Sequence, residues 1–222
     1  MNVDCAVLVV AKAPVPGLAK TRLCPPATPA QAAELAAAAL LDTLDAVLAT
    51  PGTVPVVALT GDLPAAARST ELRVALRRCT VIPQRGEDFA ERLVHAHTDT
   101  AVATDRLPVL QIGMDTPQVT PGLLRSTADL LRRDEAVLGP AEDGGWWALA
   151  LRDPERARAL GAVPMSRPDT GALTRRALES AGLRTGTATR LSDVDRMSDA
   201  GLVAGMAPDG RFAAALRTVH SR

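Results

Sequence analysis

The chain has 222 residues, of which 47% are apolar, and its 25 basic and 25 acidic side chains cancel to a formal net charge of zero. This length and apolar content suit a single α/β domain over residues 1–222 with a sizeable core. Zero net charge excludes the broad positive field with which proteins attract nucleic acids or anionic membranes. A local cluster of cations therefore has to hold any anionic ligand.

Several features of the sequence favour a cytoplasmic protein. The first residues, MNVDCAVLVV, lack the basic start of a secretory signal, and no apolar run reaches the roughly 20 residues that span a bilayer. The three cysteines are odd in number and widely spaced, which excludes a disulfide framework and a CxxC zinc site. We expect Cys5, Cys24 and Cys79 to be buried and reduced.

The predicted elements alternate between strands and helices along the chain. Valine-rich CAVLVV at 5–10 predicts a central strand covered on both faces, and Thr28 with Pro29 favours the start of a long helix over 28–50. Further strands are predicted at 54–60, 79–83, 107–113, 136–140, 146–152 and near 184–190. Further helices are predicted near 63–68, over 87–103 and 120–133, at about 169–181, and once or twice more towards the C-terminus. This alternation indicates a mostly parallel sheet.

Charged loops follow the predicted strands. AKAPVPGLAKTR, QRGED, MDTP and AEDGG come after successive strands, and SDVD follows a later one. Ligands of open parallel sheets bind outside the carboxyl ends of the strands. We therefore expect cations and carboxylates from distant stretches to meet at one edge, as a phosphate held by cations beside a metal held by carboxylates would require.

The opening loop, residues 11–23, carries the only two lysines of the chain, Lys12 and Lys20. Gly17 permits a tight turn, after which Lys20 and Arg22 place an ammonium and a guanidinium two residues apart. A lysine ammonium suits a phosphoryl oxygen whose charge changes during a reaction, whereas arginine binds two oxygens at once. The spacing is not that of a Walker A loop. The alternative is a solvated loop with two ordinary surface charges.

Acidic residues occupy the later strand ends. Asp115, in GMDTP, can bind a divalent ion that in turn holds a diphosphate, or it can form a turn before the next proline. Glu142 and Asp143 precede two glycines that let a ligand approach the backbone. Asp193 and Asp195, in SDVD, either cap the following helix or join the metal site.

Two further groups have weaker signals. Trp146 and Trp147 are adjacent in a predicted strand and therefore point to opposite faces, one towards the core and one available to stack on a base or sugar. Gln84 and Arg85, before Gly86, are candidates for hydrogen bonds to a base or an acceptor.

The histidines give no sign of a catalytic or metal site. His95 and His97 lie two apart on a predicted helix, so they face different directions and do not form a metal pair. No Ser-His-Asp or Cys-His arrangement is evident from the spacing either. Nucleophilic catalysis by a side chain is therefore not predicted.

Five stretches together resemble a family of bacterial proteins in the glycosyltransferase-A-like, or nucleotide-diphospho-sugar transferase, superfamily: AKAPVPGLAKTRL, QRGEDFAERL, VLQIGMDTPQVTPGLL, VLGPAEDGGWWALAL and LSDVDRMSDA. Relatives include the 2-phospholactate guanylyltransferases and the molybdenum-cofactor nucleotidyltransferases. The matches run in order from residue 11 to about 199, and the first and fourth are the most specific. The resemblance implies a Rossmann-like sheet with a nucleotide at its first half and Mg²⁺ or Mn²⁺ at its centre.

Carried over by motif, the resemblance gives three residues a catalytic part: Lys20 and Arg22 on phosphates, and Asp115 of the G-x-D-x-P turn on the metal. The implied metal ligands are Asp115, Asp143 and Asp195. The predicted nucleotide-binding residues are Ala11, Lys12, Gly17, Lys20, Arg22, Gln84, Arg85, Gly86, Gly144, Gly145 and Trp146. VPMSRPDTG, residues 163–171, only loosely matches the family's Pro-Trp-Ser-Thr run, which leaves recognition of the acceptor there open.

Three functions stay open. The basic loop after the first strand, and a turn that reads MDTP and not Asp-x-Asp, favour transfer of a nucleotidyl group from an NTP to a small phosphorylated or carboxylated acceptor, with release of pyrophosphate. The alternatives are a glycosyltransferase that uses an NDP-sugar and a module that senses nucleotides without turnover. The base, the sugar, the acceptor and a homodimer are not determined by the sequence.

Overall fold

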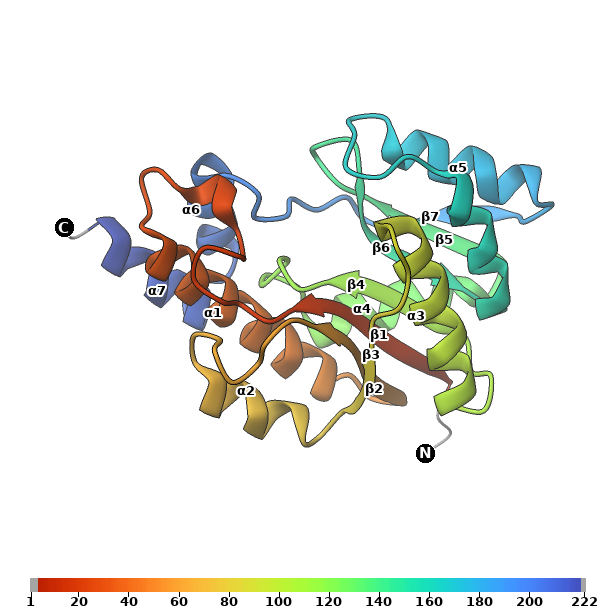
Figure 1. Ribbon diagram of the computed structural model, residues 1–222. Coiled ribbons are helices and arrows are strands. Elements are labelled where there is room, and N and C mark those ends of the chain that lie inside the picture. The colour runs from red at the N-terminus through yellow and green to blue at the C-terminus, as the bar shows by residue number, and fades with distance from the viewer. Residues whose placement is uncertain (1–3, 221–222) are drawn as a thin grey trace.

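The computed structural model describes residues 4–220 and is built around a seven-stranded sheet in the order β3-β2-β1-β4-β6-β5-β7 (Figure 1). The strands are β1 Cys5–Lys12, β2 Thr53–Thr60, β3 Thr80–Pro83, β4 Val109–Gly113, β5 Ala136–Pro140, β6 Trp146–Leu151 and β7 Thr185–Thr187. β6 pairs antiparallel with β4 and β5, and the other pairs are parallel. The predicted fold class, a mostly parallel Rossmann-like sheet, is confirmed.

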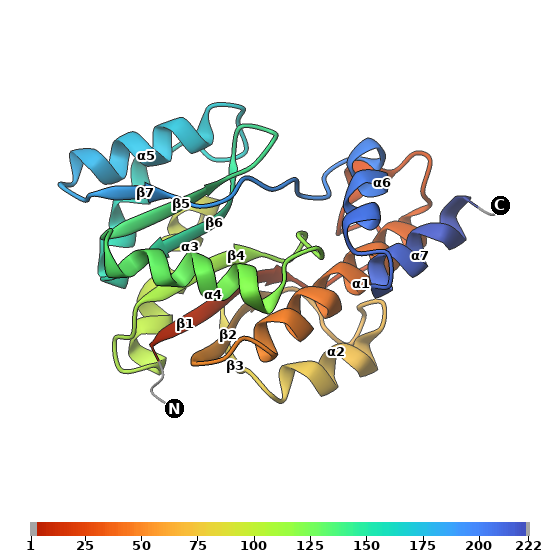
Figure 2. The ribbon, with the colours of Figure 1, turned by 180° about the vertical axis from the view of Figure 1, so that it is seen from behind.

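Two layers of helices cover the sheet (Figures 1 and 2). α1 Pro29–Leu48, α2 Ser69–Leu76 and α4 Pro121–Asp129 pack on one face, with the 3-10 helix η2 Leu130–Arg132 after α4. α3 Phe89–Ala103, the 3-10 helix η3 Pro154–Ala162 and α5 Thr170–Ser180 pack on the other. β1 explains this arrangement, because Val7 and Val9 enter the first core while Ala6 and Leu8 enter the second.

A third cluster lies beside α1, at the end of the molecule away from β7 (Figure 2). There η1 Thr21–Leu23, α6 Met197–Met206 and α7 Arg211–His220 bury Leu23 and Phe212 against α1. Asp42 of α1 accepts a hydrogen bond from the Phe212 amide at 2.8 Å, which fixes the start of α7. Because Leu23 is the last residue of the opening loop, its burial in this cluster packs that loop against the C-terminal helices.

Residues 188–196, here named the crossing segment, run from β7 to α6 over the carboxyl edge of the sheet (Figure 1). Leu191 forms an isolated bridge with Ala141 after β5, and the Val194 amide donates to the Asp115 carbonyl at 3.0 Å. The segment therefore carries the SDVD motif to the loop that follows β4.

Most predicted elements occur within a few residues of their expected bounds. Thr28 caps α1 as expected, by accepting a hydrogen bond from the Gln31 amide while Gln31 reaches back to the Thr28 amide. The helix expected near 63–68 is wrong. That stretch forms turns, the Ala67 amide donates to the Pro14 carbonyl at 3.0 Å, and the helix α2 begins only at Ser69. The 3-10 helix η3 was not predicted.

The three cysteines differ in burial. All three thiols are free; Cys5 is buried, whereas Cys24 and Cys79 are only half-buried, which corrects the expectation for those two. Burial raises the pKa of the Cys5 thiol to about 12.

Across residues 4–220, every helix is too short or too polar to cross a bilayer. Residues 1–3, part of the start on which the signal expectation rests, lie outside the described residues.

Candidate functional site

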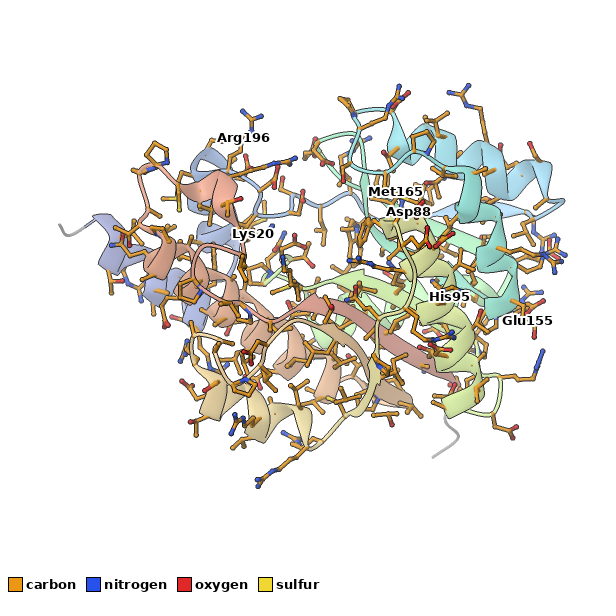
Figure 3. All side chains as sticks on the ribbon, viewed as in Figure 1. Lys20, Asp88, His95, Glu155, Met165 and Arg196 are labelled. Carbon is orange, nitrogen blue, oxygen red and sulfur yellow. The ribbon has the colours of Figure 1, made fainter. Side chains whose placement is uncertain are left out.

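A cavity of about 760 Å³ opens at the carboxyl edge of the sheet. Ligand pockets commonly have volumes of about 300–1,000 Å³, so the space suits a nucleotide-sized molecule. Its charged lining residues are Lys12, Arg22, Arg92, Asp115, Asp143, Arg167, Asp193, Asp195 and Arg196. Figure 3 shows Lys20 and Arg196 on the side of α1 and α6, and Asp88 and Met165 on the side of α3.

Lys20 is paired with the predicted metal ligand Asp115. Its Nζ donates to Asp115 Oδ2 at 2.6 Å and also to the Val194 carbonyl, and its side chain is 16% exposed. Burial acts to lower the pKa of the ammonium, but the charge and hydrogen bond of Asp115, with the charges of Asp193 and Asp195, outweigh it and raise that pKa. Lys20 therefore stays charged. It lies behind Asp115 and does not itself line the large cavity.

Arg22 makes the second ion pair of the opening loop. Its Nη1 lies 2.6 Å from Asp195 Oδ2, while 64% of the Arg22 side chain remains exposed. An exposed pair of this kind is weak, so another anion can replace the carboxylate. The expectation that opposite charges from distant stretches meet at one edge is confirmed by these two pairs.

The opening loop is shaped by its backbone. Gly17 has a φ of 77°, which glycine adopts without strain, and Lys20 itself has a φ of 49°. The left-handed backbone of Lys20 turns the chain back before η1, so that the side chains of Lys20 and Arg22 both reach towards the crossing segment.

The turn after β5 requires its glycines. Gly144 has a φ of 87°, and a Cβ added there would lie 1.9 Å from the Pro168 carbonyl oxygen. The Gly145 amide donates to Asp143 Oδ1 at 2.8 Å, which holds that carboxylate over the turn. The turn therefore packs against residues 165–170 while Asp143 and Gly145 line the cavity.

The two tryptophans point to opposite faces of β6, as predicted. Trp147 is buried in the core under α1 and donates to the Thr189 carbonyl at 2.8 Å. Trp146 lies on the α3 face, lines the cavity and donates to Thr174 Oγ1 at 3.2 Å. Trp146 is thus the one placed to contact a ligand.

Of the three predicted residues after β3, Gln84 lines the cavity, whereas Arg85 and Gly86 do not. Gln84 lines the cavity, and its Nε2 donates to the carbonyls of Ala11 and Ala58, so it ties the ends of β1 and β2 together. Arg85 does not line the cavity and forms a two-bond ion pair with Asp99 of α3, at 2.6 and 3.0 Å. Gly86 packs against Glu91 at the start of α3, where a Cβ would lie 2.8 Å from the Glu91 side chain.

Four aspartates line the cavity: Asp115, Asp143, Asp193 and Asp195. Within residues 4–220, no three His, Cys, Asp or Glu side chains lie close enough together to hold a metal ion. The pKa of the Asp193 carboxyl is nevertheless raised to about 6, first because the group is buried and then because Asp115 and Asp143 carry negative charge nearby. Carboxylate oxygens under mutual repulsion are the donors that fit Mg²⁺ or Mn²⁺. The residues therefore fit such an ion, although they are not arranged around one.

The polar cavity residues that sequence reasoning missed include Arg92 on α3, Gln111 inside β4, Arg167 before α5 and Arg196 after the SDVD motif. Gln111 alone had a visible signal, because it interrupts the apolar run VLQIG. The arginines had none, since the chain uses arginine for nearly every cation.

The fold is shared with several solved structures. A protein of Desulfovibrio desulfuricans G20, provisionally named a nucleotide-diphospho-sugar transferase, matches with a TM-score of 0.79 and 24% identity over 99% of each chain. CMP:2-keto-3-deoxy-manno-octonic acid synthetase complexed with CTP matches with a TM-score of 0.58 and 13% identity over 93% of this chain and 99% of that one. Rv0371C of Mycobacterium tuberculosis H37Rv, in complex with manganese, matches with a TM-score of 0.52 and 20% identity over 90% and 97%.

These likenesses establish the fold as that of the nucleotide-diphospho-sugar transferases. The family model DUF2064, described as an uncharacterized protein conserved in bacteria, matches residues 43–167, more than half of the chain, and the chain belongs to this family. The matched range contains the turns of Asp115 and Asp143, whereas the opening loop and the crossing segment lie outside it. None of the curated proteins compared with the chain matches it.

Proposed function

We propose that this protein is a metal-dependent transferase that moves a nucleotidyl group from an NTP to a small phosphorylated or carboxylated acceptor and releases pyrophosphate. One observation carries the proposal: the ion pairs Lys20–Asp115 and Arg22–Asp195 stand at the edge of a nucleotide-sized cavity. The fold supports it, because CMP:2-keto-3-deoxy-manno-octonic acid synthetase holds CTP on the same fold.

The cations of the opening loop bind the phosphates in this proposal. Arg22 exchanges Asp195 for a phosphate oxygen, which gains a charge-assisted hydrogen bond and leaves the carboxylate free. Lys12 lines the same cavity at the end of β1 and adds a second positive charge. Lys20 keeps Asp115 in place through its short hydrogen bond, and its positive charge acts on the bound phosphates from behind that carboxylate.

The carboxylates supply the metal site. Asp115, Asp143 and Asp195 line the cavity and would hold Mg²⁺ or Mn²⁺, which offsets the charge of the triphosphate when bound. Rv0371C, with the same fold, is known in complex with manganese. Each aspartate already has a partner in the protein: Asp115 accepts from Lys20, Asp143 from the Gly145 amide and Asp195 from Arg22.

Transfer needs position and charge compensation in this proposal. An acceptor oxygen forms a bond to the α-phosphorus while the bond from that phosphorus to the bridging oxygen breaks, and pyrophosphate leaves with the electron pair. A phosphate or carboxylate acceptor carries no proton that has to be removed, so no general base is needed. The cations near the leaving group compensate its developing charge.

The nucleoside lies along the first half of the sheet in this proposal. Ala11 and Gln84 line the cavity beside β1 and β2, and Trp146 offers a face on which a base or sugar stacks. Gly145 lets the ligand approach the turn after β5. Arg85 and Gly86, which lie outside the cavity lining, contribute by fixing the loop before α3, as do Gly17 and Gly144 in their own loops.

Glycosyl transfer from an NDP-sugar is the second candidate, and one observation favours it. Asp193 and Asp195 have the Asp-x-Asp spacing of metal-dependent glycosyltransferases, and the crossing segment brings both into the cavity. A module that binds nucleotides without turnover is the third. Both alternatives predict nucleotide binding, so the choice depends on which ligand binds and whether it is consumed.

The test is the thermal stability of the protein with each of four NTPs and four NDP-sugars, with and without Mg²⁺ or Mn²⁺, and with EDTA. A ligand at 100 times its dissociation constant adds about 2.7 kcal/mol to the free energy of unfolding. We expect a metal-dependent shift with one NTP, followed by pyrophosphate release when acceptors are supplied. The matched control is Arg184→Gln, because Arg184 forms an exposed pair with Asp134 ahead of β5, at the opposite edge of the sheet.

A shift with an NDP-sugar alone would transfer the assignment to the glycosyltransferase. A shift with an NTP that is never consumed, over a broad panel of phosphorylated and carboxylated acceptors, would identify a sensor. Stability that no nucleotide changes would refute all three functions, since each one needs a nucleotide in this cavity.

A further inference from the structure

Gln111 is a buried amide at the wall of the cavity. It lies in the middle of β4, and only 3% of the residue is exposed, yet its side chain lines the cavity. Its Oε1 lies 2.9 Å from His97 Nε2. Within residues 4–220 no group accepts a hydrogen bond from its Nε2. A polar group kept in a strand core, with an unused donor beside a cavity, indicates a ligand contact.

His97 fixes the direction in which this amide points. The imidazole, on α3, is fully buried, and burial outweighs the hydrogen bond of Gln111 to lower its pKa to about 4, so it is neutral at physiological pH. A neutral imidazole has one N–H donor. Placing that hydrogen on Nε2 lets it donate to Gln111 Oε1 and leaves only an acceptor, Nδ1, without a partner. The reverse arrangement would bury an unpaired N–H donor, which costs more.

Arg92 adds a positive charge on the same side. It is half-buried near the start of α3, lines the cavity, and its Nε donates to the Gly86 carbonyl at 3.2 Å. That bond anchors the guanidinium and leaves its terminal nitrogens for the cavity. Both donors lie on the α3 side, because Arg92 belongs to α3 and Gln111 contacts His97 of α3. Lys20 lies on the side of α1 and α6 (Figure 3), and Arg22 follows it in η1.

We propose that the Gln111 amide and the Arg92 guanidinium form an oxyanion subsite, which binds the phosphate or carboxylate group of the acceptor, with His97 as the residue that positions Gln111. This inference rests on the proposed function and deepens it, because it says which wall of the cavity recognises the acceptor. A planar guanidinium and an amide N–H₂ together match the oxygens that phosphates and carboxylates share.

The position of the subsite agrees with the proposed chemistry. An acceptor anion held on the α3 side faces phosphates held on the α1 side across one cavity, which leaves the α-phosphorus between them. Two separate cation groups also keep two anions apart that would otherwise repel each other. A purely structural Gln–His pair would not need a donor directed at the cavity.

The test follows the side-chain amide of Gln111 by ¹H–¹⁵N NMR while inorganic phosphate is added and, in a parallel titration, acetate. The amide signals are assigned by their loss in Gln111→Glu. We expect saturable shifts of these signals with at least one of the two anions, and the anion that acts names the acceptor's group. Arg92→Gln should weaken that binding about tenfold or more, because a charged hydrogen-bond donor is lost.

Two comparisons separate recognition from folding. Gln111→Leu and Gln111→Glu, which lack the reporting amide and are therefore followed by calorimetric titration of the same anions, should both abolish anion binding at this wall; if the first fails to fold, the second still retains an acceptor for His97. His97→Leu should weaken anion binding, whereas His97→Gln, which keeps a donor at the reach of Nε2, should restore it. Arg22→Gln, on the opposite wall, should leave the Gln111 shifts in place.

Two results would overturn the inference. The first is a Gln111 amide that neither anion moves. The second is a loss of the NTP-dependent stability shift in Gln111→Glu, which would place Gln111 in the nucleotide subsite. Conversely, saturable anion shifts at Gln111 in a protein that no nucleotide stabilises would keep the oxyanion subsite and refute the proposed function, so the two failures are distinguishable.

Discussion

The two walls of the cavity prepare for a ligand in opposite ways. On the α1 side, the cations of the opening loop are satisfied by the protein's own carboxylates, Lys20 by Asp115 and Arg22 by Asp195. On the α3 side, Gln111 is held by a neutral partner and keeps a donor free. A ligand on the first wall has to displace an internal anion, whereas a ligand on the second completes an unfinished set of hydrogen bonds. A metal ion that takes up the displaced carboxylates should therefore strengthen binding at the first wall, whereas the second wall has no carboxylate to displace.

The largest expected effect is on the first wall, at Asp115. We expect Asp115→Asn to lower turnover by about 10²-fold or more, the usual cost of removing one fixed polar group from a reacting centre. Nucleotide affinity should fall less, because the phosphates still have Arg22 and Lys12. Turnover is measured as pyrophosphate release and affinity by titration of the same preparation. Asp134→Asn, ahead of β5, is the control. Equal losses of turnover and affinity would contradict a catalytic role.

The next effect belongs to the second wall and concerns stability against pH. The pKa of His97 is about 4 in the folded protein and near 6.5 when the imidazole is exposed. The unfolded chain therefore binds the proton more readily, so the free energy of unfolding falls as the pH drops from about 6.5 to about 4. The loss attributable to His97 is about 3 kcal/mol.

Denaturant unfolding at a series of pH values measures this loss in the wild type and in His97→Gln. Both proteins share every other titrating group, so the difference between their curves isolates the imidazole. Parallel curves between pH 6.5 and 4 would mean that His97 is not held neutral, and the reasoning about its tautomer would fail with it.

A third and smaller effect sharpens the contrast in charge. Arg22→Gln should weaken NTP binding about tenfold, since one charge-assisted hydrogen bond is lost, and should reduce the dependence of binding on salt. Arg184→Gln, whose side chain is about as exposed and also pairs with an aspartate, should change neither quantity. Equal behaviour of the two variants would remove Arg22 from the phosphate site.

The smallest effect tests the internal counter-ion directly. Without metal, Asp195→Asn should raise the affinity for inorganic pyrophosphate about 1.4- to 5-fold, because an exposed ion pair of about 0.2–1 kcal/mol no longer competes for Arg22. Calorimetric titration in the presence of EDTA measures this change. With Mg²⁺ the same variant should bind pyrophosphate more weakly. An unchanged or lower metal-free affinity would show that Asp195 does not occupy the anion's place.

Much of this arrangement could be predicted from the sequence, since it depends on local patterns. The valine run of β1, the Thr-Pro start of α1 and the charged strand ends all follow from propensity and topology. The alanine-rich stretch at 63–68 was predicted as a helix because propensity ignores tertiary competition. There Arg68 adopts a φ of 51°, and the Ala67 amide bonds to Pro14, far away in the sequence.

Partner choice could not be predicted. Lys20 was expected on a phosphate, yet its nearest anion is Asp115, 95 residues further along. Arg85 was expected on a ligand and instead pairs with Asp99 of α3, 14 residues further along. Nothing local distinguishes these arginines and lysines from their neighbours. Gln111 was overlooked because its role depends on its contact with His97, and the sequence does not show that His97 is buried.

The crossing segment makes the site depend on residues that are synthesised long after the opening loop. Lys20 contacts Val194 across 174 positions, and Arg22 contacts Asp195 across 173. A nascent chain that ends before this segment can pair β1, β2, β3 and β4 and can form the Lys20–Asp115 pair, but it lacks Asp193 and Asp195 and leaves Arg22 without its carboxylate partner. In the proposed function, metal-linked nucleotide binding therefore requires residues 188–196 to be in place, so it arises only after these long-range contacts have closed.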